Sequence, residues 1–337
     1  MTDGSPPAKQ SEIRRLIALF ALAYFAQGLS QHGGLISQPL NYYLKTGLGL
    51  SATDISEYLA ILSIPWMVKP IYGLISDYIP LLGYRRRTWL MLTNLIAASG
   101  FLWLIGLTDV STIVVALVLT AFGTAFSDVI IDALVVENGN RTGQTARFQG
   151  MQWIAFRVAA ILAALTGGYL ASLFEPATAL HVAATITMLA PIAVLTIAYL
   201  VVREQPAKID IVELRATTRS TLAAVKSPTL QIAAAFLAIW CFSPAFGTPM
   251  YYHMVNVLNF EQAFIGQLTA LTSVGGLIGA ILFTRLLANK PVSFRATFAV
   301  IAASCVIMPF HLLTEPSSYA SQLAPVLNVI NGAIMQI

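Results

Sequence analysis

The sequence has few charged residues for its size. Of its 337 residues, 10% are Asp, Glu, Lys or Arg, whereas 57% are hydrophobic. Soluble globular proteins carry about 25% charged residues, because they need polar surface. The composition therefore excludes a water-soluble domain and predicts a multi-pass protein of the lipid bilayer.

Cysteine is also scarce, with Cys241 and Cys305 each inside an apolar run. This excludes a disulfide framework and gives no metal-binding spacing. The sequence also lacks a phosphate-binding glycine loop and a nucleophile placed beside a base. We therefore expect no catalytic residue, no cofactor and no metal site, and predict that the protein is not an enzyme.

Long apolar runs predict an all-α fold, because a membrane span needs about 20 apolar residues. Ten such spans are predicted, at 14–40, 52–76, 88–108, 111–136, 147–173, 178–202, 229–256, 261–286, 293–313 and 318–337. The first has no small-residue cleavage site and is too long for a signal-peptide core, so we expect a retained helix.

The basic residues predict the orientation. If the N-terminus is cytoplasmic, most of the 19 Lys and Arg residues fall in cytoplasmic segments, as the positive-inside rule requires. We therefore expect a cell (inner) membrane protein with a cytoplasmic N-terminus. The net charge of +4 is then a topology signal and needs no nucleic-acid partner.

A polar segment divides the chain into unequal parts. The predicted units are an N-terminal six-helix bundle, a cytoplasmic linker and a partial C-terminal bundle, at 1–203, 204–228 and 229–337. Pro39 and Tyr42 recur at the same spacing as Pro249 and Tyr252, and internal repeats are common in secondary transporters. With four spans in the second part, we expect a fragment of a twelve-helix protein; the alternative is a complete ten-helix carrier.

The segment after the second span carries a recognisable pattern. It contains Lys69-Pro70, the spacing from Gly73 to Asp77, and Gly83-Tyr84 followed by three arginines. The Gly73 to Asp77 part resembles the loop between helices two and three of the major facilitator superfamily. The whole string, with the stretches 126–137, 149–170 and 243–249, is similar to the folate-biopterin transporter family. This resemblance implies a major facilitator fold and transport of folates or pterins.

Three charged residues interrupt predicted spans. Asp128 and Asp132 lie one helical turn apart in the fourth span, and Arg157 lies in the fifth. A charge at the bilayer centre costs roughly 2.5 to 3.5 kcal/mol, so such residues usually mark a transport route or a buried ion pair. If the two spans form a hairpin, Asp128 is level with Arg157. We expect these two to pair beside the transport cavity, or as a structural clasp.

Further polar residues are candidates for contact with the solute. The first span places Gln27, Gln31 and Gln38, with Tyr42, on one helix face, and the second places Tyr58 and Lys69 on one face. The remaining candidates are Gln149, Gln152 and Tyr252. The alternatives are hydrogen bonds between helices for the glutamines, snorkelling for Lys69 and an interfacial position for Tyr252.

A separate charged cluster is expected at the cytoplasmic side. Its predicted members are Asp77, Arg85, Arg86, Arg87 and Glu137, and Asp132 is close enough to join it. Carboxylates beside arginines form charge-assisted hydrogen bonds, so we interpret this cluster as structural.

The predicted function is secondary active transport of a small anionic organic solute, coupled to protons. In this hypothesis Arg157 attracts the anion while Asp128 takes up and releases a proton. The alternatives are a muropeptide-type or other permease of the same superfamily, a channel, and a membrane receptor that binds its solute without moving it.

Overall fold

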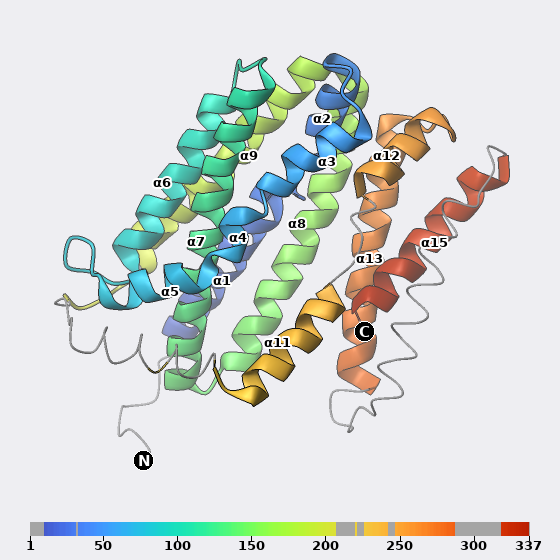
Figure 1. Ribbon diagram of the computed structural model, residues 1–337. Coiled ribbons are helices and arrows are strands. Elements are labelled where there is room, and N and C mark those ends of the chain that lie inside the picture. Colours follow the sequence, from blue (N-terminus) through green and yellow to red (C-terminus); the bar gives the residue numbers. More distant parts are fainter. Residues whose placement is uncertain are drawn as a thin grey trace.

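The computed structural model describes residues 10–31, 33–206, 220, 226–241, 247–286 and 318–336. Its helices fall into two groups, which we call the N-half and the C-half (Figure 1). The N-half consists of α1 (Gln10–Ser30), α2 (Ser37–Tyr42), the π-helix η1 (Tyr43–Gly47), α3 (Ala52–Ile61), α4 (Ile64–Met67), α5 (Lys69–Tyr78), α6 (Arg87–Leu104), α7 (Val110–Thr142), α8 (Thr145–Leu173) and α9 (Pro176–Val201). The C-half consists of α11 (Pro228–Cys241), α12 (Gly247–Asn256), α13 (Gln262–Leu286) and α15 (Ser318–Gln336).

Five segments of the described chain are long and apolar enough to cross a membrane. They are Gln10–Ser30, Ala52–Tyr78, Val110–Thr142, Thr145–Leu173 and Pro176–Val201. Large apolar side chains such as Leu102, Leu189 and Leu200 are more than half exposed on their outer faces. A soluble protein rarely exposes apolar surface so widely, so the chain is a multi-pass membrane protein, as predicted.

The longest helix, α7, shows how local sequence sets a helix's ends. Asp109 caps its start, where the carboxylate accepts the Thr112 N–H at 3.1 Å. Gly143 ends it in a left-handed conformation with φ of 67°, which glycine adopts at little cost. The helix therefore runs beyond the predicted span 111–136, to Thr142.

Neither of the first two predicted spans is one continuous helix, although Ala52–Tyr78 still forms a single candidate membrane span. Span 14–40 is divided between α1 and α2 by an irregular turn, in which the Leu35 N–H donates to the Leu29 carbonyl. Span 52–76 is divided into α3, α4 and α5. Pro65 and Pro70 lie in the first turns of α4 and α5, where a missing N–H is tolerated but the preceding helix cannot continue.

The predicted spans after residue 228 agree with the structure to different degrees. Span 229–256 contains two helices, α11 and α12, and residues 242–246 between them lie outside the described residues. Span 261–286 corresponds to α13, and span 318–337 to α15. The predicted span 293–313 lies outside the described residues.

Helix packing does not follow the order of the chain. α8 lies mainly against α1 and α13, whereas α7 lies mainly against α6. The α6–α7 contact is close, since a Cβ atom on Gly123 would lie 2.5 Å from the Thr93 carbonyl oxygen. We call the end of the molecule at which the N-half carries Arg85–Arg87 the basic end, and the opposite end, where α2 and α12 lie, the far end (Figure 1).

Candidate functional site

An ion pair lies inside the N-half, between α5 and α7. Lys69 Nζ donates to Asp128 Oδ2. The Asp128 side chain is 5% exposed and that of Lys69 is 33% exposed. The ammonium also lies 4.5 Å from the centroid of the Trp66 ring, a cation–π contact. The buried carboxylate is therefore neutralised by a cation at the start of α5, where the helix break places it.

Asp132, one turn further along α7, has a different neighbour. It accepts a hydrogen bond from the Tyr24 hydroxyl of α1 and is exposed. Gln152 of α8 lies beside it. The Gln152 amide nitrogen is buried, with no hydrogen-bond partner found among the described residues. We call Tyr24, Lys69, Asp128 and Asp132 the charged cluster; with Gln152 it joins α1, α5, α7 and α8.

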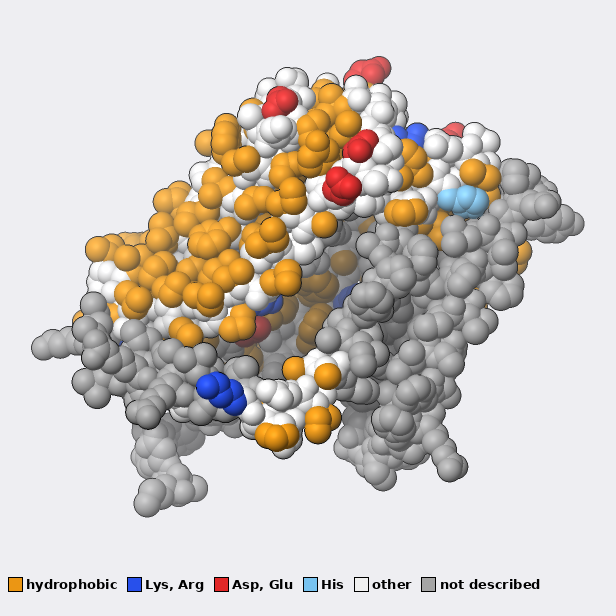
Figure 2. Space-filling model, viewed as in Figure 1, with side chains coloured by type: hydrophobic (Ala, Val, Ile, Leu, Met, Phe, Trp, Pro, Cys, Tyr) orange, Lys and Arg blue, Asp and Glu red, His pale blue; other side chains and the backbone are white. Residues whose placement is uncertain are grey.

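Arg157 lies on the side of α8 that faces the C-half. A Cβ atom on Gly276 of α13 would lie 3.3 Å from its guanidinium carbon, so the guanidinium rests against the α13 backbone. Figure 2 shows a hollow beside the N-half, with acidic and basic side chains inside it. The hollow is thus lined by charge although the surface beside it is apolar.

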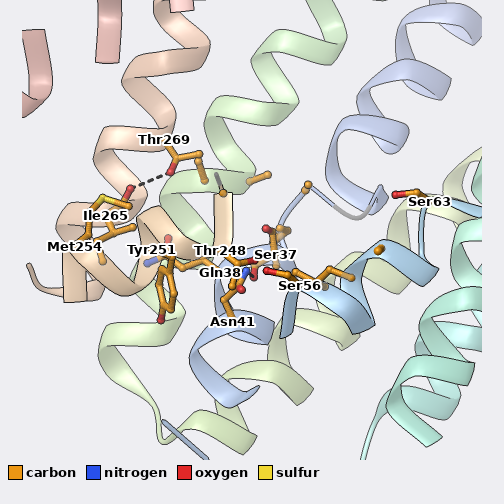
Figure 3. Close-up of a pocket in the computed structure, with 18 residues that line it drawn as sticks. Ser37, Gln38, Asn41, Ser56, Ser63, Thr248, Tyr251, Met254, Ile265 and Thr269 are labelled. Atoms are coloured by element: carbon orange, nitrogen blue, oxygen red, sulfur yellow. Dashed lines mark hydrogen bonds between the residues drawn. The ribbon is translucent and has the colours of Figure 1, made fainter. Parts of the chain in front are cut away.

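A cavity of about 490 Å³ lies at the far end, between α2 and α3 on one side and α12 and α13 on the other (Figure 3). Its polar lining residues carry only hydroxyl or amide groups: Ser37, Gln38, Asn41, Ser56, Ser63, Thr248, Tyr251 and Thr269. Asn41 Nδ2 donates to the Ser37 carbonyl at 2.9 Å, whereas the buried Asn41 Oδ1 finds no partner in the described part of the chain. The cavity therefore offers hydrogen bonds without charge.

The two halves touch at the far end through what we call the far-end contacts. These are three pairs: Gln38 with Gln262, Tyr252 with Leu50, and Gly168 with Gly266. Gln38 Nε2 lies 3.2 Å from Gln262 Oε1, and the Tyr252 hydroxyl donates to the Leu50 carbonyl. A Cβ atom on Gly168 would lie 2.8 Å from Gly266 Cα. None of these groups is charged.

At the basic end, Arg86 connects acidic residues of two other helices. Its Nη2 lies 2.5 Å from Asp77 Oδ1 and 2.7 Å from Glu137 Oε1, and its Nη1 donates to Ser76 Oγ at 3.0 Å. Arg86 is buried, whereas both carboxylates reach solvent. The start of α6 is thereby tied to α5 and α7.

Glu204, just after α9, binds the same corner. Its carboxylate accepts the backbone N–H groups of Arg85, Arg86 and Arg87 at 2.9, 2.9 and 3.1 Å. These are free donors at the start of α6, where negative charge is favourable. We call Asp77, Arg86, Glu137 and Glu204 the basic-end clasp.

The sequence was compared with known protein families. Residues 27–313, most of the chain, match the BT1 family. The chain belongs to the BT1 family. This confirms the resemblance found in the sequence and places the chain among transporters, in agreement with the prediction that it is not an enzyme.

The chain is also similar to curated transporters. It is 32% identical over 282 residues to the folate-biopterin transporter of Synechocystis sp. (strain PCC 6803), which covers 82% of this chain and 55% of the relative. It is 24% identical over 284 residues to folate transporter 1 of Plasmodium falciparum, covering 81% and 53% respectively. The chain thus spans about half the length of these relatives.

Solved structures confirm the predicted major facilitator fold. The nucleoside transporter NupG superposes with a TM-score of 0.69 at 13% identity, over 97% of this chain and 80% of that one. The D-xylose-proton symporter gives a TM-score of 0.65 at 13% identity, over 96% of this chain and 80% of that one. Identity this low shows the shared fold alone.

The predicted partner of Asp128 was wrong in this BT1 chain. The hairpin argument required α7 and α8 to lie side by side along their length, but α8 packs on α1 and α13 instead. Asp128 consequently pairs with Lys69 of α5, and Arg157 lies against α13. Asp132 contacts Tyr24, while Arg86 takes Asp77 and Glu137.

The two predicted polar stripes were also wrong, because each crosses a helix break. Gln27 belongs to α1 and Gln38 to α2, with Gln31 in the turn between them. Tyr58 lies in α3 and Lys69 in α5. Gln149 is exposed near the start of α8, Gln152 is buried by the charged cluster, and Tyr252 belongs to the far-end contacts.

Several contacts of the candidate site were not predicted. They involve Tyr24, Asn41, Trp66, Glu204 and Gln262. Trp66 precedes Lys69 by three residues, a spacing that could have suggested a cation–π contact on one helix face. The other contacts join distant segments and leave no local signal.

Proposed function

We propose that the chain is a secondary transporter that moves a small organic anion, of the folate or pterin class, across the cell (inner) membrane. The observation that carries this proposal is the Lys69–Asp128 ion pair, which lies within predicted membrane spans. Ionisable side chains are costly within the bilayer, so a pair of them there usually marks a transport route. The named relatives supply the solute class.

The orientation follows from the basic residues. By the positive-inside rule, the basic end faces the cytoplasm, so the far-end contacts close the outer side. The solute then reaches the charged cluster from inside. Residues 1–203 and 229–337 form the two moving units, joined by the cytoplasmic segment 204–228, and alternate between this state and one open at the far end.

Proton and solute transport are coupled because the anion and Asp128 compete for Lys69. In the empty site Lys69 neutralises Asp128, and Arg157 adds a second positive charge that attracts the anion. An anion arriving near Lys69 weakens its hold on Asp128, because both negative groups compete for one ammonium. A proton then binds Asp128 in place of Lys69, so that proton and anion cross together.

The experiment is uptake of radiolabelled folate by the purified protein in liposomes with an imposed pH gradient. The proposal expects accumulation above the external concentration. Binding without uptake would indicate a receptor, and equilibration without accumulation a channel. Stronger competition by anhydro-muropeptides than by folate or biopterin would indicate a muropeptide permease.

A further inference from the structure

Resting on the proposed function, we infer that the solute is elongated, with an uncharged hydrogen-bonding ring at one end and an anionic group at the other. The ring occupies the far-end cavity, and the anionic group binds Arg157 on the seam between α8 and α13. The site is therefore built for folate-type molecules, which carry both parts, rather than for a pterin alone.

The cavity selects against charge. Its described lining contains hydroxyls, amides and apolar groups such as Leu59, Met254 and Ile265, but no ionisable Asp, Glu, Lys, Arg or His. An anion moved there from water would lose its hydration without gaining a counter-charge, which is strongly unfavourable. Its volume of about 490 Å³ is within the usual range for a small-molecule site, about 300 to 1,000 Å³.

Asn41 indicates what kind of neutral group fits. Its side-chain nitrogen is occupied by the Ser37 carbonyl, whereas the buried oxygen has no partner in the described part of the chain. A buried acceptor without a partner is destabilising, so a ligand N–H placed there gains more than an ordinary hydrogen bond. Ser56 of α3 and Thr248 of α12 supply hydroxyls to the cavity lining (Figure 3). An aminated heterocycle offers matching donors and acceptors.

The seam fixes where the anionic end lies. Gly168 faces Gly266 at the far end, and Arg157 faces Gly276 nearer the basic end. On each helix the two contacts are separated by a similar number of residues, so α8 and α13, which run in opposite directions, pack closely between them. The solute therefore lies beside this line of contact. Ala164, a wall residue of the cavity, precedes Gly168 by one turn.

The distance between the two subsites sets the length of the solute. Arg157 and Ala164 are seven residues apart, which brings them to the same face of α8 and separates them by roughly 10 Å along its axis. A molecule that fills both subsites must span about this distance. Folate has a pterin ring at one end and a glutamate at the other, whereas biopterin has no anionic group to reach Arg157.

The test is equilibrium competition binding on the whole protein, using three probes. Folate has the ring and the anionic tail, biopterin has the ring alone, and p-aminobenzoyl-glutamate has the tail alone. The variants are Asn41→Leu and Arg157→Gln. Matched controls are Thr53→Ala, an exposed residue of the cavity helix α3, and Arg147→Gln, an exposed arginine of α8.

We expect the two variants to act on different probes. Asn41→Leu should weaken folate and biopterin by about 3- to 10-fold, the effect of one lost hydrogen bond, and leave p-aminobenzoyl-glutamate unchanged. Arg157→Gln should weaken folate and p-aminobenzoyl-glutamate by about 10- to 100-fold, since a charged hydrogen bond is stronger, and leave biopterin unchanged. Both controls should match the wild type.

Two results would overturn the inference. If each variant weakened all three probes equally, or if Asn41→Leu with a wild-type melting temperature bound folate normally, the two-subsite arrangement would be wrong while folate recognition still stood. If the wild type bound none of the probes, the proposed function itself would fail. If Asn41→Leu lowers the melting temperature, Ser56→Ala replaces it as a smaller change in the same cavity.

Discussion

The two ends of the molecule are held in opposite ways. At the basic end, the ion pairs of Arg86 with Asp77 and Glu137 join helices within the N-half. At the far end, contacts cross between the N-half and the C-half and use amides, a tyrosine hydroxyl and glycines. The clasp at the basic end therefore uses ion pairs within one half, whereas the far-end contacts between the halves are made by uncharged groups.

The difference matches what each end must do in a transport cycle. Separating a partly buried ion pair leaves charges without partners, which costs several kcal/mol. A hydrogen bond or a glycine contact can be exchanged for water at a cost of about 0.5–1.5 kcal/mol. Contacts that open in every cycle should therefore be of the second kind, and those that keep one half rigid of the first.

The largest effect is expected at the basic-end clasp. Arg86→Leu removes the cation shared by Asp77 and Glu137 and should lower the free energy of unfolding by about 2 to 3 kcal/mol, a figure reduced because both carboxylates reach water. Thermal unfolding in detergent measures this. Arg85→Leu is the control, because no ion pair of Arg85 is found among the described residues. Equal destabilisation by both variants would remove the distinction between the ends.

The far end should respond by changing conformation, with little loss of stability. Gly266→Val cannot keep the close contact with Gly168. Overpacking of about 1–3 kcal/mol shifts the balance of states roughly 5- to 150-fold towards the one open at the far end. A cysteine introduced at Ser56, in a background without Cys241 and Cys305, should then react faster with a membrane-impermeant maleimide added outside.

The matched control for this conformational shift is Gly150→Val, the same exchange on α8 where a Cβ atom meets nothing within 4 Å. It should leave the labelling rate unchanged. Equal labelling of the wild type and Gly266→Val would show that the glycine contact does not hold the far end closed.

A smaller effect is expected from Glu204. Glu204→Gln keeps the shape but removes the negative charge that receives three N–H groups at the start of α6, so unfolding should become easier by about 1 kcal/mol. Labelling at the far end should stay at the wild-type rate. An altered labelling rate would mean that the clasp acts across both halves.

The smallest effect is expected from Tyr252→Phe. It removes the hydroxyl that donates to the Leu50 carbonyl and should favour the open far end by about 0.5–1.5 kcal/mol. The same labelling assay measures this, with Tyr169→Phe, an exposed tyrosine of α8, as the control. A change larger than that of Gly266→Val would place the main closure on the tyrosine.

The fold was largely predictable because lipid imposes a simple pattern. Runs of apolar residues locate both ends of α6, α8 and α9, and the start of α7, to within a few residues. Residues 14–40 and 52–76 are not single helices, because apolar composition locates a span without reporting local breaks inside it. The prolines at 65 and 70 were visible, but a proline in a membrane helix predicts a kink as readily as a break.

The site was less predictable, because its partners come from distant segments. Asp128 and Arg157 were recognised as unusual from their own surroundings, which one sequence supplies. The choice of Lys69 as the partner of Asp128 depends on α5 packing against α7, and Tyr24 reaches Asp132 only because α1 packs there. Such neighbours depend on tertiary packing, which the register of a helical hairpin does not predict.

The most direct test of the account is the response of Asp128→Asn to a pH gradient. Asparagine keeps the shape and accepts a hydrogen bond from Lys69, but it cannot take up a proton near neutral pH. We predict that the variant in liposomes still exchanges labelled folate for unlabelled folate, but no longer accumulates folate when the side from which it is taken up is made acidic. Wild-type accumulation by Asp128→Asn under the same gradient would contradict the central claim that this carboxylate couples the proton to the solute.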